Sequence, residues 1–166
     1  MKQQQETPSS QGRDTNLARL LLEFGRDYER RVIDRLHRMG HSLIRPSHIT
    51  VFWNLGLGAV RVTELAERAH VTQQAMGKML KELERIGYVV RDIDGRDRRA
   101  KKIRPTARGT ELMRGMAEAT NEVRRFYADQ VSEDTLLELE QQLASCIRKI
   151  GQEDTAVIWA KPIRAA

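Results

Sequence analysis

The chain is poor in the residues that stabilise small secreted domains or span membranes. It contains one cysteine among 166 residues, which excludes an internal disulfide and a cysteine-based zinc finger and is typical of a reducing compartment. No apolar run approaches the roughly 18 to 20 residues of a membrane-spanning helix. Residues 1–14 lack the apolar core of a secretory signal. We therefore expect a cytoplasmic protein without membrane contact, whose residues 1–14 form a disordered tail.

Motifs of common catalytic and cofactor sites are also missing. The sequence has no glycine-rich phosphate loop, no nucleophile elbow and no metal-binding triad. Acidic residues are interspersed with basic residues at helical spacing, as on solvated helix faces. We therefore expect neither enzymatic activity nor a bound cofactor.

Positive charge is present in excess, and it is concentrated in one segment. The formal net charge of the whole chain is +6. Residues 61–109 hold 13 Lys and Arg against 7 Asp and Glu, whereas the remainder holds 16 of each sign. A surplus that served solubility would be spread along the chain. A localised surplus is typical of a surface that binds phosphate.

Within this segment the residue pattern predicts a helix followed by a basic hairpin. Apolar residues recur at core spacing over 72–86, Gly87 ends the helix, and residues 88–91 and 100–104 are expected to be strands joined by an Asp94-Gly95 turn. A helix fits the major groove of DNA, and a hairpin tip can reach the backbone or the minor groove. Double-stranded DNA is therefore the expected partner. A winged helix that packs only against protein is the alternative.

A short helix over 62–69, capped by Thr63, is expected to precede the longer one. Two helices joined this closely form a helix-turn-helix, in which the second helix reads bases near its start. The candidate DNA-binding residues are Thr72, Gln73, Gln74, Gly77, Lys78 and Lys81 on the helix and Arg96, Arg98 and Arg99 at the hairpin tip.

Long amphipathic helices are expected on both sides of this unit, over 15–39, from 106 onward, and over 132–150, with another helix opening near Pro46. Their apolar stripes exceed what a compact helix-turn-helix core can cover. Such stripes usually mark an interface, and a homodimer suits two-fold symmetric DNA. A monomeric bundle in which these helices cover one another is the alternative.

The expected fold is mainly α-helical with a small β-hairpin wing: a winged helix-turn-helix with N- and C-terminal dimerisation helices. We assign residues 46–105 to a DNA-binding domain, residues 15–45 and 106–150 to the dimerisation helices, and residues 151–166 to a C-terminal tail.

Aromatic character is concentrated in the first two expected helices, in a chain that is only 5% aromatic. This group could line an effector pocket near the hinge between the two parts. Ordinary core and dimer packing is the alternative. The residues concerned are Phe24, Tyr28, His48, Phe52 and Trp53.

Two further features suggest sensing but favour simpler interpretations. His37 and His41 have a spacing that suits zinc on one helical face, but no cysteine or carboxylate cluster accompanies them and Gly40 interrupts the helix. We expect solvent-exposed or interface histidines instead. Cys146 follows the apolar side of the last helix, so we expect a buried packing residue rather than a redox switch.

Three motifs, in this order and spacing, resemble those of the MarR family of bacterial winged-helix transcription regulators. Residues 62–66 followed by 71–72 match the start of the family's helix-turn-helix. Residues 94–99 match its wing pattern Asp-x-Arg-Asp-x-Arg, and residues 106–112 match the Thr-x-x-Gly-x-x-Leu that opens the next helix. The resemblance extends over about residues 17–150.

The resemblance implies an obligate homodimer that binds a palindromic operator, commonly as a repressor, and is released by a small aromatic or lipophilic effector. It places Arg96 in the minor groove and Lys78 against the major groove or phosphate. Many members have arginine where this chain has Lys78, and lysine cannot fork guanine as arginine does. Pro105 stands where leucine is usual, which is acceptable just before a helix. A DNA-organising protein without sequence preference is the other DNA-binding alternative.

Overall fold

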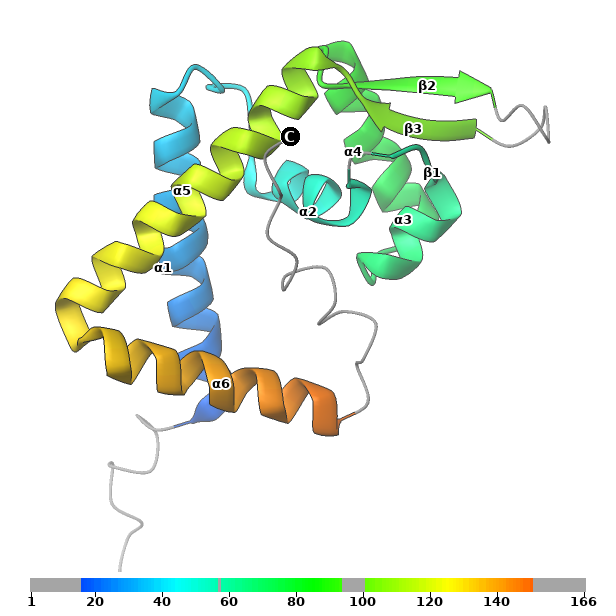
Figure 1. Ribbon diagram of the computed structural model, residues 1–166. Helices are drawn as coiled ribbons and strands as arrows, with labels where there is room; N and C mark the ends of the chain where they lie inside the picture. Colours follow the sequence, from blue (N-terminus) through cyan, green and yellow to red (C-terminus); the bar gives the residue numbers. More distant parts are fainter. Residues whose placement is uncertain (1–15, 57, 94–100, 151–166) are drawn as a thin grey trace, which may run out of the picture.

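The computed structural model describes residues 16–56, 58–93 and 101–150. The described part is mainly helical with a small antiparallel sheet, as expected (Figure 1). The tails 1–14 and 151–166 assigned from the sequence lie outside the described residues. In chain order the elements are α1 (Leu17–Arg38), α2 (Pro46–Leu55), β1 (Val60–Arg61), α3 (Val62–Arg68), α4 (Gln73–Arg85), β2 (Val89–Ile93), β3 (Lys101–Pro105), α5 (Ala107–Val131) and α6 (Glu133–Lys149).

The sheet has the strand order β1-β3-β2, and both pairings are antiparallel. The hairpin of β2 and β3 is the expected wing, with Val89 opposite Pro105 and Arg91 opposite Ile103. β2 continues to Ile93, two residues further than its pattern predicted. β1 was not expected. It pairs antiparallel with β3, with Val60 opposite Ile103, and so forms the third strand of the sheet.

The helix starts are set mainly by short polar side chains. Thr72 accepts a hydrogen bond from Ala75 N at 3.1 Å at the start of α4, and Thr106 accepts one from Gly109 N at 3.1 Å at the start of α5. The expected cap at Thr63 is wrong. α3 follows β1 without a break, so Arg61 occupies the cap position.

The chain bends sharply between α5 and α6, so that α6 leaves the far end of α5 at a steep angle (Figure 1). Ser132 forms this corner with a φ of 85°, a left-handed conformation that is uncommon for a residue other than glycine. Its hydroxyl accepts a hydrogen bond from Thr135 N at 3.3 Å and caps α6. No helix in the described ranges is long and apolar enough to cross a membrane.

One hydrophobic core joins the helix-turn-helix to the flanking helices. Leu36 of α1, Ile49 of α2, Leu80 of α4 and Leu112 of α5 are all fully buried in the same cluster. The N-terminal half of α1 and most of α6 lie outside it. In α6, Leu136 is the one residue that is buried within this chain.

The junction between the wing and α5 is unusually close. Thr106 Oγ1 donates a hydrogen bond to Gly87 O at 2.7 Å, and Thr106 N donates to Tyr88 O at 3.1 Å. A Cβ at Gly109 would overlap the carbonyl oxygen of Tyr88 and lie 3.1 Å from Pro105 Cβ. The Thr-x-x-Gly pattern thus has a physical reason, because threonine caps α5 and only glycine permits this approach.

Candidate nucleic-acid interface

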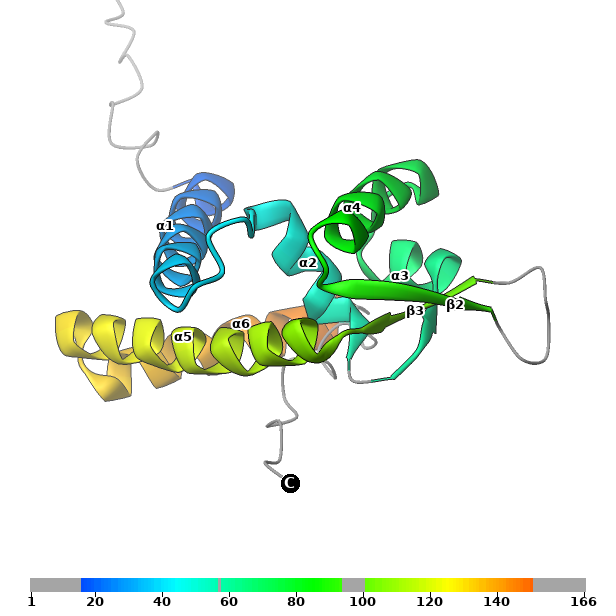
Figure 2. The same ribbon diagram turned by 90° about the horizontal axis from the view of Figure 1, so that it is seen from above.

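α4 has one face in the core and one in solvent. Met76, Leu80 and Leu83 are fully buried. Among the sequence candidates on α4, Gln73, Gln74, Lys78 and Lys81 are exposed and Gly77 is half-buried, while Thr72 is the exposed cap. Figure 2 shows α4 on the opposite side of the molecule from α5 and α6. The structure therefore presents these side chains together on one outward helix face.

Charged pairs lie along the strands of the wing, and one of them connects the wing to α4. Arg91 Nε lies 3.0 Å from Glu84 Oε2 of α4, and Arg104 pairs with Asp92 across the hairpin. The first pair joins the wing root to the end of α4, and the second joins the two strands of the wing. The tip candidates Arg96, Arg98 and Arg99 lie outside the described residues.

The C-terminal end of α4 is held by the first turn of α5. Arg108 Nη1 donates a hydrogen bond to Ile86 O at 3.2 Å, which satisfies one carbonyl at the helix end. The same guanidinium lies 4.5 Å from the ring centroid of Tyr88, in cation–π geometry. α4 is thereby tied to a helix outside the helix-turn-helix.

A buried histidine holds the other side of α4. His48 is fully buried, and its Nδ1 accepts a hydrogen bond from Arg45 N at 3.3 Å. In the neutral ring this places the proton on Nε2, which lies 3.3 Å from Glu82 Oε2. Arg45 Nη1 approaches the second oxygen, Oε1, at 3.1 Å. The carboxylate of Glu82 in α4 thus lies between Arg45 and His48 at the start of α2.

The five effector-pocket candidates divide into two sets. Phe24 and Tyr28 of α1 lie against Tyr127 of α5, with ring centroids at 4.8 and 5.9 Å. Tyr28 also donates a hydrogen bond to a backbone oxygen of α5, and burial raises the pKa of its hydroxyl to about 12. His48 and Phe52 lie instead in the core beneath α4, and Trp53 packs partly buried against that core. The positions of these residues along the two helices did not predict that they would lie in two separate places.

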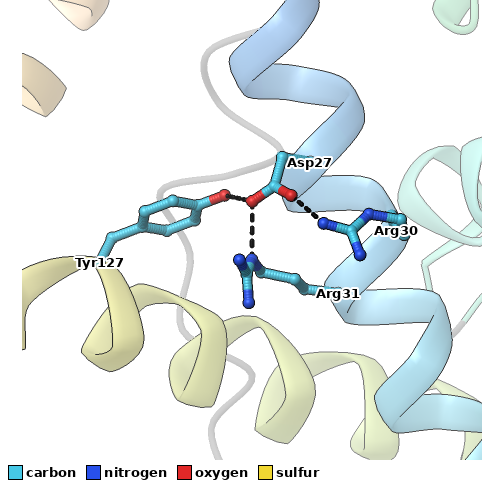
Figure 3. Close-up of polar contacts among 4 residues, drawn as sticks. All are labelled: Asp27, Arg30, Arg31 and Tyr127. Atoms are coloured by element: carbon cyan, nitrogen blue, oxygen red, sulfur yellow. Dashed lines mark hydrogen bonds and ion pairs between the residues drawn. The ribbon is translucent and has the colours of Figure 1, made fainter. Parts of the chain in front are cut away.

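A polar cluster joins α1 to α5 beside the first set (Figure 3). Tyr127 donates a hydrogen bond to Asp27 Oδ2 at 2.5 Å, and Arg31 Nε donates to the same oxygen at 2.6 Å. With Arg30 also bound, these donors hold the pKa of the Asp27 carboxyl far below its ordinary value. Arg31 in turn lies 3.9 Å from the Phe126 ring centroid. Asp27 and Arg31 are four residues apart on one helix, whereas Tyr127 is one hundred positions from Asp27 in the sequence.

The two histidines of the zinc hypothesis point to different partners. His37 Nε2 lies 2.8 Å from Ile44 O, and His41 Nδ1 lies 2.9 Å from the hydroxyl of Tyr88. His41 is only 5% exposed, so the expectation of a solvent-exposed or interface residue is wrong for it. Cys146 is exposed rather than buried, because α6 packs so little against its own chain. Within the described ranges, no three His, Cys, Asp or Glu side chains gather as metal ligands would.

Burial lowers the pKa of both core histidines. At His48 the carboxylate of Glu82 opposes this effect and the Arg45 guanidinium adds to it. At His41, Glu111 opposes it and Arg108 adds to it. Both rings are therefore held in the neutral form.

Acidification should lower the free energy of unfolding from about pH 6.5 downward. Below that value the unfolded histidines take up protons that folded His41 and His48 bind less readily, so stability falls as the pH falls toward their depressed pKa values. Urea unfolding at pH 7 and pH 5 measures this loss. His48→Gln should show a smaller difference between the two pH values than the wild type does. Equal pH dependence in wild type and His48→Gln would contradict a role for His48.

Comparison with known proteins agrees with this architecture. Residues 56–101, which run from the end of α2 to the start of β3, match the model of the MarR family. This winged-helix segment is therefore similar to the MarR family. The resemblance inferred from the three motifs is thereby confirmed. No curated protein sequence matches the chain significantly.

Solved structures extend the likeness to the flanking helices. The reduced form of MarR from E. coli has a TM-score of 0.70 at 17% identity, covering 80% of this chain and 96% of that one. The transcriptional regulator SlyA has a TM-score of 0.67 at 19% identity, covering 87% and 99%. A mutant of S. aureus MepR bound to an oligodeoxyribonucleotide has a TM-score of 0.52 at 17% identity, covering 81% and 98%. At these identities the similarity establishes the MarR fold.

Proposed function

We propose that this chain is a transcription regulator that binds a palindromic DNA operator as a homodimer and reads its sequence with α4 and the wing. The observation that carries the proposal is the outward face of α4, which combines the amides of Gln73 and Gln74 with the ammonium groups of Lys78 and Lys81. A glutamine amide can bond adenine at two atoms in the major groove, and lysine neutralises phosphate or contacts guanine. The localised charge of residues 61–109 supports the same partner.

Gly77 gives independent support. Glycine inside a helix lowers stability by about 0.5 to 1 kcal/mol relative to alanine. A Cβ at Gly77 would meet no described atom of the protein within 4 Å, and the residue does not have a positive φ. The fold in the described ranges thus gives no reason for glycine here. Close approach of DNA to this face of α4 would give one.

The homodimer is supported by apolar side chains that this chain leaves uncovered. On α1, Leu17 is 67% exposed and Leu22 is 58% exposed, and on α6 Leu137 and Leu139 are each 43% exposed. Uncovered apolar area on two helices favours a second copy over a monomer. Two copies related by a two-fold axis would present two α4 helices to successive major grooves, about one helical turn apart. We propose that α1 and the helices after the wing form this interface.

Repression, and release by a small effector, rest on the family resemblance. Two partly exposed aromatic side chains lie beside the polar cluster of Figure 3. Phe24 is 38% exposed and Phe126 is 37% exposed. We propose that an aromatic or lipophilic effector binds there. His48 and Phe52, being fully packed beneath α4, are less suited to contact a ligand.

Gln74→Ala should change sequence preference more than non-specific affinity. Loss of the amide should weaken binding to the preferred sequence by about tenfold, the value of one good base contact, while phosphate attraction is unchanged. The preferred duplex is obtained by enriching a random-sequence DNA library on the wild-type protein. Affinity for it and for a scrambled duplex is then measured for both proteins.

Lys78→Ala is the matched control for this measurement. If Lys78 contacts phosphate, its loss should weaken binding to every sequence and reduce the salt dependence by about one charge. An equal loss on both duplexes for Gln74→Ala would place that side chain on phosphate rather than on a base. Such a result would favour a DNA-organising protein without sequence preference.

A further inference from the structure

Three parts of the chain that are distant in sequence meet around Tyr88. This residue stands between the end of α4 and the start of β2, and it is fully buried. Its hydroxyl lies 2.9 Å from His41 Nδ1 in the turn between α1 and α2, and its ring faces Phe52 of α2 at 6.4 Å. Arg108 of α5 lies over the same ring. Tyr88 therefore contacts both the DNA-reading unit and the helices that flank it.

The imidazole of His41 lies beside Gly115 of α5. Its Nε2 side faces α5, where a Cβ at Gly115 would lie 3.8 Å from Nε2 and 3.4 Å from both Leu36 Cδ2 and Met39 Sδ. Because the pair is buried, removing one partner costs the other this hydrogen bond in a place that bulk water does not reach.

The position of Tyr88 sets the position of both DNA-contacting elements. Gly87 before it ends α4, and Val89 after it begins β2. α5 holds this point through backbone atoms, since Arg108 and Thr106 bond the carbonyls of Ile86 and Gly87. The hydrogen bond from His41 links the same point to the turn between α1 and α2, and it is made to the side chain of Tyr88 rather than to the backbone.

We infer that His41, through its hydrogen bond to Tyr88, is a positioning residue for DNA recognition. It holds α4 and the wing at the angle to α1 and α5 that an operator with two half-sites requires. The inference rests on the proposed function, because the angle matters only if two copies read one duplex. Non-specific attraction to phosphate depends on charge, which neutral His41 and Tyr88 do not supply, whereas reading two half-sites depends on their spacing.

The test measures tolerance to half-site spacing. Tyr88→Phe removes only the hydroxyl, His41→Leu removes the imidazole, and His41→Asn keeps a polar atom near the position of Nδ1. The probes are the duplex enriched by the wild-type protein, the same duplex with its centre one base pair longer or shorter, and a scrambled duplex. Thermal melting by circular dichroism identifies any variant that does not fold.

Tyr88→Phe and His41→Leu should each reduce the preference for native over altered spacing by about three- to tenfold, the net value of one hydrogen bond. Affinity for the scrambled duplex should not change, the double variant should lose no more than either single one, and His41→Asn should retain the preference. If His41→Leu does not fold, the comparison of Tyr88→Phe with His41→Asn decides the question, because the first removes only the hydroxyl and the second keeps a hydrogen-bonding atom at residue 41.

Two different results would overturn different claims. If wild type distinguishes the native spacing and Tyr88→Phe distinguishes it equally well, His41 does not position the reading unit. The same conclusion follows if the double variant loses as much preference as the sum of the two single variants, because two coupled residues do not give additive losses. If wild type itself binds the enriched and scrambled duplexes equally, the proposed function fails and the inference fails with it.

Discussion

Gly109→Ala should lower the free energy of unfolding by about 3 kcal/mol, at the upper end for overpacking a core. The added methyl group would overlap the carbonyl oxygen of Tyr88. This obstacle is backbone and cannot rotate away, and the same oxygen accepts the bond from Thr106 N. Relief therefore requires α5 to move away from the junction of α4 and the wing. Urea unfolding followed by circular dichroism, at one protein concentration, measures the loss.

Gly77→Ala is the matched control for that experiment. It makes the same substitution in a helix, but its Cβ meets open space, so stability should rise by about 0.5 to 1 kcal/mol. If Gly109→Ala were as stable as the wild type, the close approach of α5 to Tyr88 would not exist in solution.

Leu20→Glu should give a folded monomer whose affinity for the preferred duplex falls about a hundredfold or more. Leu20 is 48% exposed in the single chain and shares one face of α1 with Leu17 and Leu21. A carboxylate there costs little in the monomer but would be buried in the proposed dimer interface. Without the dimer, the two half-sites bind independently and the gain from linking them is lost. Sedimentation velocity gives the oligomeric state, and fluorescence anisotropy gives the affinity.

Leu43→Glu provides the comparison for this variant. Leu43 is 54% exposed, but it lies in the turn between α1 and α2 rather than on the apolar face of α1. The Leu43→Glu variant should remain dimeric and bind DNA as the wild type does. A Leu20→Glu protein that stays dimeric would exclude this face of α1 from the interface, and a monomeric wild type would refute the dimer itself.

Local signals in the sequence were sufficient for most of the secondary structure. Helix ends depend on backbone groups within a few residues, so the pattern alone predicted helix starts near residues 72 and 106 and a helix end at Gly87. β1 was missed because a two-residue strand has no periodicity, and its partner Ile103 lies more than forty residues away in the sequence. Thr63 was predicted as a cap for the same reason, since nothing local shows that β1 leads directly into α3.

The candidate site was predictable where helical spacing decides exposure and unpredictable where distant packing decides it. The outward face of α4 follows from the positions of its apolar residues. The burial of His41 does not, because it depends on packing against Tyr88, which is 47 positions away in the sequence. The pairing of Asp27 with Tyr127 likewise joins residues one hundred positions apart.

The most direct test of the proposed function is an anisotropy titration of wild-type protein against the enriched duplex and a scrambled duplex of equal length, each at two salt concentrations. A sequence-specific regulator should prefer the enriched duplex by about 10³ or more, and its binding to both should weaken as salt rises. Equal and steeply salt-dependent binding to the two duplexes would contradict sequence-specific regulation and indicate a DNA-organising protein. No binding to either would contradict DNA recognition altogether and indicate a winged helix that binds protein.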